Sequence, residues 1–237
     1  MNRRNYELIA FDMDGTLLTS EKTLSPVTLA AIAEATGRGD RAAVASGRSL
    51  TQMYDYLPQL LEVGIRYSIT GNGALVYDSQ LSRILYKAVL TSREVATVVE
   101  AFRPEGDLVM VETFSDGAFT VDERQIPRMD SYGMGVYQAM FDRLAERVDD
   151  MPAYMLDGDA RIEKVNLHFS DLDALDRVRH RLDGSGLETS VSEVWSIEVT
   201  PKGVSKGAGL LALADKLGID RERTVGVGDG GNDLSLV

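Results

Sequence analysis

Short apolar runs alternate with segments of helical periodicity at the start of the chain. Residues 6–11 are almost continuously apolar, which is typical of a strand buried on both faces of a parallel sheet. Ser25 and Pro26 predict the start of a helix, because serine caps helix N-termini and proline fits the first turn. The alternation predicts an α/β fold with right-handed crossovers. The elements expected here are strands at 6–11, 42–45 and 67–70 and helices at 26–36 and 53–61.

The pattern becomes antiparallel after residues 71–73. Runs at 74–77 and 84–89 predict a hairpin, and Thr91 followed by Glu94 predicts a capping box that opens a helix. Antiparallel strands mixed with helices in this way are typical of a separate α+β unit. Its further expected elements are strands at 108–114, 117–122, 165–169, 189–192 and 196–200 and helices at 91–102 and 171–182.

The alternation of helix and strand found at the start of the chain returns near its end, with a helix expected at 205–217 and a strand at 224–227. We therefore expect one α/β domain interrupted by an inserted one. The predicted domains are a core formed by residues 1–84 and 195–237 and an insertion at 85–194. Because the chain stops within the helix expected after the last strand, we also expect the natural C-terminus to lie a few tens of residues further on.

Composition and charge exclude several classes of function. The chain has no cysteine, so disulfides, thiolate metal sites and thiol nucleophiles are excluded and any metal is expected to be hard. A net charge of −12 argues against nucleic acid as a partner, since phosphate backbones require basic surface. No segment has the length and hydropathy of a signal peptide or a membrane span. These features predict a cytoplasmic protein with no membrane partner.

Two carboxylates end the first predicted strand. Asp12 and Asp14 lie two residues apart, at the carboxyl end of a strand, where open α/β sheets bind their ligands. Asp12 there is suited to act as a metal ligand or nucleophile and Asp14 as a general acid and base. The alternative is a polar turn after a strand, which Asp and Gly residues also favour.

A second acidic cluster, which contains Asp229 and Asp233, ends the last predicted strand. It is expected to meet Asp12 and Asp14 at one edge of the sheet, where four negative charges need a compensating cation. Oxygen ligands without cysteine favour Mg²⁺. The alternative is that the later pair only caps the following helix.

Two further segments are candidates for binding phosphate. Ser46 and Gly47 end the second strand with a hydroxyl and backbone N–H groups at a helix start, although serine there also suits a simple N-cap. Lys206 opens a later helix and is a candidate point charge for a phosphate oxygen, although a single helical lysine is usually solvated. Each signal is weak alone, and their occurrence with both acidic clusters is strong.

Together these segments resemble the haloacid dehalogenase superfamily phosphatases of the Cof-like, or type IIB, group. The four matching motifs are Asp12-Met13-Asp14-Gly15-Thr16, Ser46, Lys206 and Gly228-Asp229-Gly230-Gly231-Asn232-Asp233. The resemblance implies a Rossmann-like core with a parallel sheet and an inserted α+β cap domain. It also implies that Asp12 is the nucleophile that forms an aspartyl-phosphate and that Asp14 serves as acid and then as base.

The same resemblance implies the ligand set. Mg²⁺ would bind Asp12, the backbone carbonyl of Asp14 and Asp229. Asp233 would support the site, and the phosphoryl group would be held by Ser46, Gly47, Lys206 and Asn232.

Candidates for contact with the rest of the substrate are Arg48 near the core site, Asn72, and the cap-loop residues Glu163, Lys164 and Trp195. The alternative for each of them is a purely structural role. The two histidines, His168 and His180, fall in the predicted insertion. We expect His168 to be packed or at the surface and His180 to be a surface residue, and neither to be catalytic.

The leading hypothesis is a Mg²⁺-dependent phosphatase acting on small phosphorylated metabolites such as sugar phosphates, as a monomer or weak homo-oligomer. A phosphotransferase or phosphomutase would use the same intermediate with another acceptor. A receiver-type phosphoacceptor without turnover would also combine acids, Mg²⁺, a hydroxyl and a lysine. Asp14 argues against the receiver, because an acid two residues after the nucleophile is suited to hydrolysing the intermediate.

Overall fold

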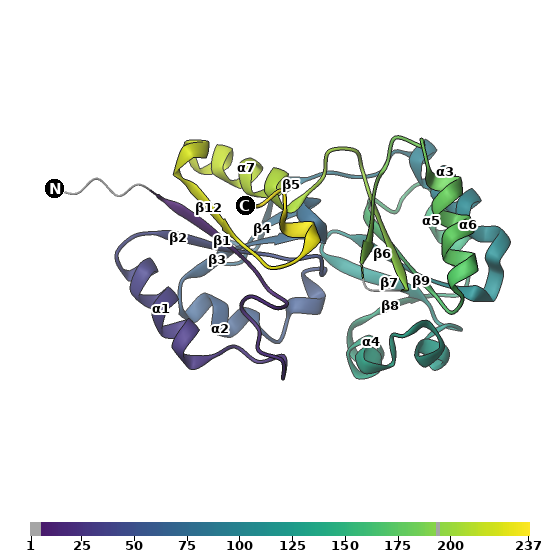
Figure 1. The fold of residues 1–237 in the computed structure, drawn as a ribbon, viewed down its shortest axis with the longest axis horizontal. Coiled ribbons are helices and arrows are strands. Elements are labelled where there is room, and N and C mark those ends of the chain that lie inside the picture. Colours follow the sequence, from purple (N-terminus) through teal and green to yellow (C-terminus); the bar gives the residue numbers. More distant parts are fainter. Residues whose placement is uncertain (1–5, 193–194) are drawn as a thin grey trace. The chain divides into compact units, whose positions relative to one another are not determined.

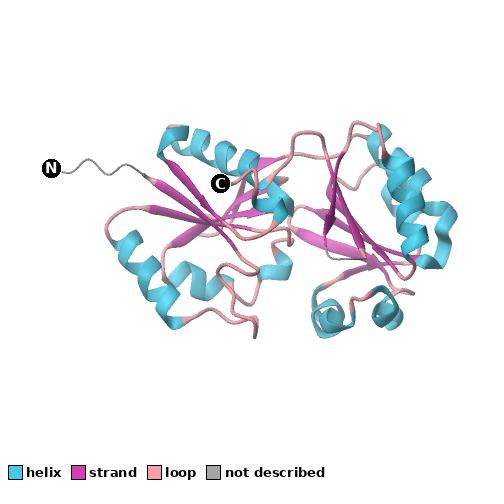
Figure 2. Cartoon of the chain, viewed as in Figure 1, coloured by secondary structure: helices cyan, strands magenta, loops and turns pink. Residues whose placement is uncertain are grey.

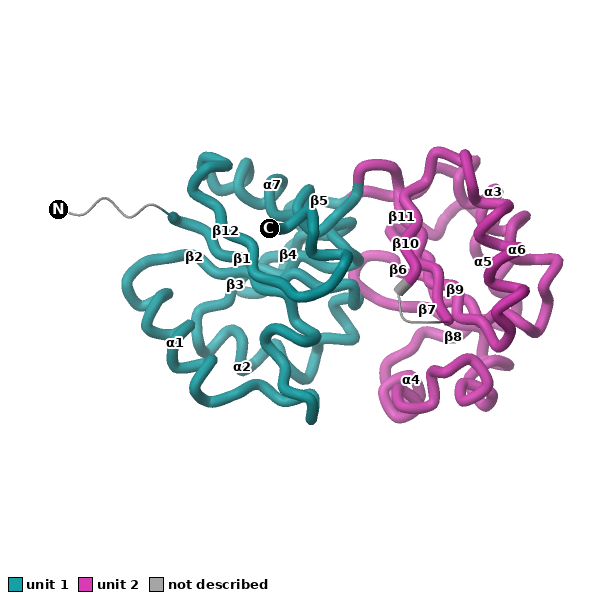
Figure 3. The backbone as a smooth tube through the Cα atoms, in the orientation of Figure 1, with its two compact units in different colours: residues 1–87, 204–237 teal, residues 88–203 magenta. Residues whose placement is uncertain are grey.

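A computed structural model describes residues 6–192 and 195–237. In it the chain forms two compact units (Figure 3). Unit 1 comprises the chain up to Lys87 together with Val204–Val237, and unit 2 comprises Ala88–Gly203.

Unit 1 is built on a six-stranded sheet with the order β12-β1-β2-β3-β4-β5. The first four strands in this order run parallel, and β4 and β5 add antiparallel strands beside β3. The predicted parallel α/β sheet is therefore confirmed. Its strands are β1 (Leu8–Asp12), β2 (Arg41–Ala45), β3 (Ile65–Thr70), β4 (Leu75–Asp78), β5 (Arg83–Lys87) and β12 (Thr224–Val227).

Helices cover both faces of this sheet (Figures 1 and 2). On one face, α1 (Pro26–Gly37) and α2 (Leu57–Glu62) enclose an apolar cluster that includes Ile32 and Leu60. On the other face, α7 (Lys206–Leu217) packs Leu210 and its apolar neighbours against the strands. The helix expected at 53–61 is shorter, since a proline in its first turn sets a later start and Thr51–Met53 form a separate 3-10 turn.

Unit 2 has its own six-stranded sheet with the order β10-β11-β9-β6-β7-β8. One face is covered by α3, α5 and α6, and a second apolar cluster with Phe141 of α4 lies against β6 and β7. The capping box between Thr91 and Glu94 is present at the start of α3. Its elements are α3 (Ser92–Phe102), β6 (Val109–Ser115), β7 (Ala118–Asp122), α4 (Gln138–Leu144), β8 (Glu146–Val148), α5 (Met151–Leu156), β9 (Ile162–Phe169), α6 (Leu172–Leu182), β10 (Glu188–Ser192) and β11 (Ser196–Thr200).

Both unit boundaries lie later in the chain than the sequence analysis places them. The boundary expected at 84 would cut β5, which pairs with β4 and so belongs to the sheet of unit 1. The boundary expected at 195 would assign β11 to the core, but β11 pairs with β9 and β10 in unit 2. In the part of the chain that the structure describes, no helix is long and apolar enough to span a membrane.

Gly73 allows the turn after β3 to pack against the start of α7. Its φ is +99°, and a Cβ built there would lie 2.0 Å from the carbonyl oxygen of Ser205. We expect Gly73→Ala to lower the free energy of unfolding by about 3 kcal/mol, because it adds a backbone clash to a left-handed conformation. The control Gly218→Ala has a φ of +67° but open space around its Cβ, and should cost about 1 kcal/mol. Equal losses in urea denaturation would contradict this account.

Candidate active site

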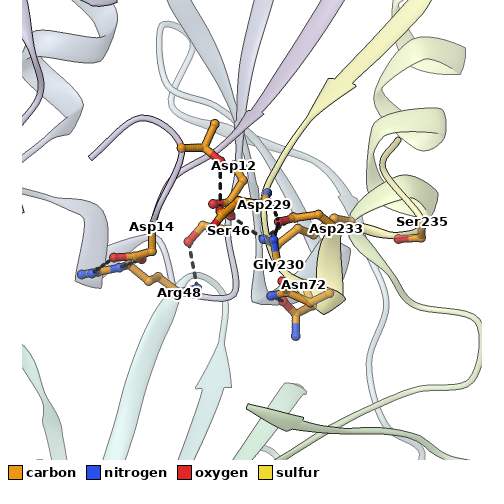
Figure 4. Close-up of polar contacts among 12 residues, drawn as sticks. Asp12, Asp14, Ser46, Arg48, Asn72, Asp229, Gly230, Asp233 and Ser235 are labelled. Carbon is orange, nitrogen blue, oxygen red and sulfur yellow. Dashed lines mark hydrogen bonds and ion pairs between the residues drawn. The ribbon is translucent and has the colours of Figure 1, made fainter. Parts of the chain in front are cut away.

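Three parallel strands bring acidic and hydroxyl side chains to one edge of the unit 1 sheet (Figure 4). Asp12 is the last residue of β1, Ser46 directly follows β2, and Asp229 follows β12. Since parallel neighbours end at the same edge, these three residues come together from distant parts of the sequence. The location matches the edge predicted from the sequence pattern.

Lys206 links the two acidic clusters. Its Nζ donates hydrogen bonds to Oδ1 of Asp12 at 2.5 Å and to Oδ1 of Asp233 at 2.7 Å. All three residues are buried, with Lys206 only 1% exposed, so the reading of this lysine as solvated surface is wrong. Lys206 is held there because it is the first residue of α7, whose N-cap Ser205 accepts a hydrogen bond from the N–H of Ala208.

The surroundings of Asp12 disfavour the ionised form of its carboxyl group. Burial raises the pKa of Asp12, while the hydrogen bond and charge of Lys206 act in the opposite direction and the nearby charge of Asp233 adds to the rise. Its Oδ2 is buried and has no hydrogen-bond partner among the described residues. Burying a carboxylate oxygen without a hydrogen-bond donor lowers the stability of the folded state. This arrangement therefore indicates a role other than folding.

The carboxylates of Asp12, Asp229 and Asp233 fit a hard cation. One ligand atom from each lies within 4.8 Å of the others, and three negative charges exceed the one positive charge of Lys206. Both oxygens of Asp233 already accept hydrogen bonds. Its Oδ1 accepts from Lys206, and its Oδ2 accepts from the backbone N–H groups of Asp229 and Gly230 at 3.1 and 2.9 Å. Asp12 and the exposed Asp229 are therefore the candidates for direct ligands, and the hydrogen bonds of Asp233 hold the loop that carries Asp229.

Asp14 faces different partners from Asp12 (Figure 4). Arg48 donates to both of its oxygens, from Nε at 2.7 Å and from Nη2 at 2.8 Å, and Lys22 donates from Nζ at 2.8 Å. Burial opposes ionisation of Asp14, but the hydrogen bonds and charges of Arg48 and Lys22 outweigh it and lower the pKa to about 2. In this arrangement Asp14 is a paired carboxylate.

This pairing predicts a pH dependence of stability. Because the pKa of Asp14 falls from its ordinary 3.8 to about 2, the ion pair stabilises the folded state above about pH 4 and the gain is lost as the pH falls towards 2. We expect Arg48→Met to remove part of that loss, so that its free energy of unfolding declines less steeply over this window. Arg38→Met, which breaks an exposed pair with Glu34, should leave the slope unchanged. Urea denaturation over a pH series measures both, and parallel curves for wild type and Arg48→Met would rule the explanation out.

The candidate phosphate-binding residues lie beside the carboxylates. The buried Ser46 accepts a hydrogen bond at its Oγ from the backbone N–H of Arg48 at 3.2 Å. Asn232 donates from Nδ2 to Oδ1 of Asn72 at 3.5 Å, so two residues predicted from separate motifs are in contact. Gly47 lies in the chain between Ser46 and Arg48. The phosphate-binding roles themselves stay predictions.

Two residues that contact the acidic side chains of the site were not predicted from the sequence. Lys22, which contacts Asp14, lies in a turn with a φ of 57° and carries no local signal of a site. Thr16 donates from Oγ1 to Oδ1 of Asp229 at 3.1 Å. Its place within the first motif was the available signal, but no role was derived for it.

The comparison with protein families identifies the class. A family model for haloacid dehalogenase-like hydrolases matches residues 9–237, and the chain belongs to that family. The resemblance to its Cof-like phosphatases and the expectation of a hydrolase are thereby confirmed.

Relatives that are named as phosphatases align along most of the chain. The HMP-PP phosphatase of Cronobacter sakazakii is 28% identical over 96% of this chain and 79% of its own length. The 5-amino-6-(5-phospho-D-ribitylamino)uracil phosphatase YbjI of Escherichia coli is 27% identical over 98% and 81%.

Solved structures share the fold. A haloacid dehalogenase-like hydrolase from Bacteroides thetaiotaomicron matches with a TM-score of 0.79 and 24% identity, covering 98% of this chain and 85% of that one. A sugar phosphatase of subclass IIB matches with a TM-score of 0.78 and 22% identity, covering 97% and 83%. Both matches support an α/β core accompanied by an α+β cap domain.

Proposed function

We propose that this phosphoric monoester hydrolase uses Asp12 to cleave small phosphorylated metabolites in the presence of Mg²⁺. The observation that carries the proposal is the Asp12 carboxylate, whose Oδ1 accepts a hydrogen bond from Lys206 and whose buried Oδ2 has no hydrogen-bond partner among the described residues. An oxygen in that position is available to attack phosphorus or to bind a cation. The reaction needs no base to activate a serine, because the carboxylate of Asp12 is itself the nucleophile.

The reaction divides into two steps. In the first, an oxygen of Asp12 attacks phosphorus, the ester P–O bond breaks, and the leaving oxygen takes a proton from Asp14. In the second, the Asp14 carboxylate takes a proton from water, the water oxygen attacks phosphorus, and the bond to Asp12 breaks to release phosphate. Both aspartates then regain their starting protonation state, as general acid–base catalysis requires.

Arg48 has a defined part in this scheme. Asp14 is a carboxylate while Arg48 and Lys22 hold it, so the acid step requires that this pairing be loosened and that Asp14 first take up a proton from solvent. The substrate is itself an anion and competes with Asp14 for the guanidinium. Arg48 therefore serves as a substrate contact whose engagement frees Asp14 to carry a proton.

The remaining charged and polar groups bind and neutralise. Asp12 and Asp229 would hold Mg²⁺, with the backbone carbonyl of Asp14 as the further ligand that family membership implies. When bound, Mg²⁺ neutralises charge on the transferring phosphoryl group. Lys206 keeps an ammonium beside Asp12. Hydrogen bonds to the phosphoryl oxygens would come from Ser46, Gly47 and Asn232, with Asn72 next to Asn232.

The substrate class follows the relatives. The phosphatases named above act on HMP-PP and on a phosphorylated ribitylaminouracil, and a structural neighbour is a sugar phosphatase. All of these are small phosphorylated metabolites, and we propose a substrate of the same kind. A cytoplasmic location and a monomeric or weakly oligomeric state stay predictions from the sequence.

The test is steady-state phosphate release from a panel of sugar phosphates and other small phosphomonoesters, with Mg²⁺ and after chelation. We expect turnover with Mg²⁺ and a loss of roughly a thousandfold without it, the size of effect expected for several kcal/mol of charge stabilisation. Mg²⁺-independent turnover would refute the metal. Stoichiometric phosphorylation without release would replace the hydrolase by a phosphoacceptor, and release only with an added alcohol acceptor would indicate a phosphotransferase.

A further inference from the structure

A second group of buried polar side chains lies on the sheet of unit 2. We call it the polar cluster, and it consists of Glu112 on β6, Asn166 and His168 on β9, and Ser196 on β11. The register pairs Glu112 with Asn166 and His168 with Ser196, so all four lie on the same face of the sheet. Each is less than 8% exposed.

Hydrogen bonds fix the orientation of this cluster. Asn166 donates from Nδ2 to Oε2 of Glu112 at 2.6 Å. A carboxylate only accepts, so the amide nitrogen must face Glu112 and the carbonyl oxygen must face away. His168 contacts Ser196 Oγ through Nδ1 at 2.8 Å and lies 3.5 Å from Glu112 Oε2 through Nε2.

The carbonyl oxygen of Asn166 is left without a partner. Oδ1 is buried and no described residue donates a hydrogen bond to it. The amide cannot be turned to satisfy it, because that would direct the oxygen at the Glu112 carboxylate. Since nearly all buried polar atoms in folded proteins are paired, an orphaned acceptor of fixed orientation requires an explanation.

Folding of unit 2 does not explain this cluster. On the opposite face of β9, the alternate residues Val165, Leu167 and Phe169 all belong to an apolar core. On the same face of β6, Met110 and Phe114 on either side of Glu112 belong to another. Apolar residues at the cluster positions would avoid the desolvation of a carboxylate and an amide. The polar side chains are therefore kept at a cost to stability, as binding sites are.

The charges of the cluster define what it binds. Glu112 is an acidic residue, and the nearby buried Lys164 on β9 is paired with Glu198 on β11 at 2.6 Å, so these three side chains together carry no excess positive charge. An anion is disfavoured there, while a neutral or cationic group that donates a hydrogen bond satisfies Asn166 Oδ1. The hydroxyls of a polyol and the amine of an aminopyrimidine share this chemistry.

We propose that Glu112, Asn166 and His168 form a binding site for a neutral or cationic organic group that donates hydrogen bonds to the Asn166 carbonyl. The site lies within unit 2 and goes beyond the reaction proposed at Asp12. Its occupant is recognised through N–H or O–H donors and not through a phosphate.

The experiment follows the side-chain amide signals of Asn166 by NMR in the full chain while xylitol, 4-aminopyrimidine or inorganic phosphate is added at up to roughly 10 mM, a range that detects weak affinity. We expect xylitol or 4-aminopyrimidine to shift these signals, and the probe that does so identifies the source of the donor. Absence of a shift with both probes, or a shift with phosphate alone, would overturn the proposal.

Two variants locate the binding by calorimetry. Asn166→Leu should weaken affinity for the active probe roughly tenfold, since a buried hydrogen bond is lost. Thr113→Val removes the unpartnered Oγ1 of the next residue along β6 from Glu112, which points to the other face, and should leave affinity unchanged. Asn166→Asp replaces the leucine variant if that one does not fold. Unchanged affinity in the Asn166 variant would contradict the site, and phosphate release measured on the same samples tests the proposed reaction separately.

Discussion

Asp12→Asn should lower phosphate release at least about 10⁴-fold, because the amide cannot form the phosphorylated intermediate. Folding should be affected little. Burial and the neighbouring Asp233 disfavour the Asp12 charge, so a neutral amide of the same shape removes one of the two carboxylates that share Lys206. We expect the free energy of unfolding to change by no more than about 1 kcal/mol.

The matched control for this substitution is Asp215→Asn. Asp215 is an exposed residue of α7 in the same unit, and its variant should retain wild-type turnover. Steady-state kinetics and urea denaturation on the three proteins measure both quantities. If Asp12→Asn retained more than about a tenth of wild-type turnover, Asp12 would not be the nucleophile.

Lys206→Met should unfold or severely weaken unit 1. The substitution leaves Asp12 and Asp233 buried without their shared cation, and breaking a buried ion pair by removing one partner costs about 3–5 kcal/mol. Adding Mg²⁺ should restore part of the loss, since a cation bound between the carboxylates supplies the missing charge. Turnover should fall even where the variant folds.

The control for Lys206→Met is Lys202→Met. Lys202 lies four residues earlier in the chain and is exposed, so its loss should be within about 0.5 kcal/mol. Thermal and urea denaturation with Mg²⁺ and with a chelator separate the two effects. Equal stability of the two variants would show that Lys206 is not the charge that holds the carboxylates together.

Periodicity predicted the long elements and missed the short ones. The strand that ends at Asp12 has an uninterrupted apolar pattern, and the helix that follows Thr91 has a capping box. Both elements form as expected. Helices α4 and α5 have only seven and six residues and β8 only three, too few for a repeat to be read. Helices α4 and α5 are positioned by packing in the apolar clusters of unit 2, and β8 is positioned by pairing with β7.

The candidate site was predictable where strand ends decide it. Asp12, Ser46 and Asp229 lie together because parallel strands share an edge, which the sequence pattern implies. The partners of Asp14 were not predictable, because Arg48 and Lys22 reach it through side-chain conformations and a loop that no periodicity encodes. Strand pairing likewise decided the unit boundaries, since β5 and β11 are assigned by their neighbours in the sheets.

The most direct test of the central claim is to find the phosphoryl group on Asp12 during turnover. Wild type and Asp14→Asn are mixed with a substrate from the panel in Mg²⁺, quenched in acid within the first turnovers and analysed by peptide mass spectrometry. The account predicts phosphorylation of the peptide that contains Asp12, with more of it retained in Asp14→Asn, because the second step loses its base. Release of phosphate with no modified Asp12 at any time, or with the modification on another residue, would contradict the account.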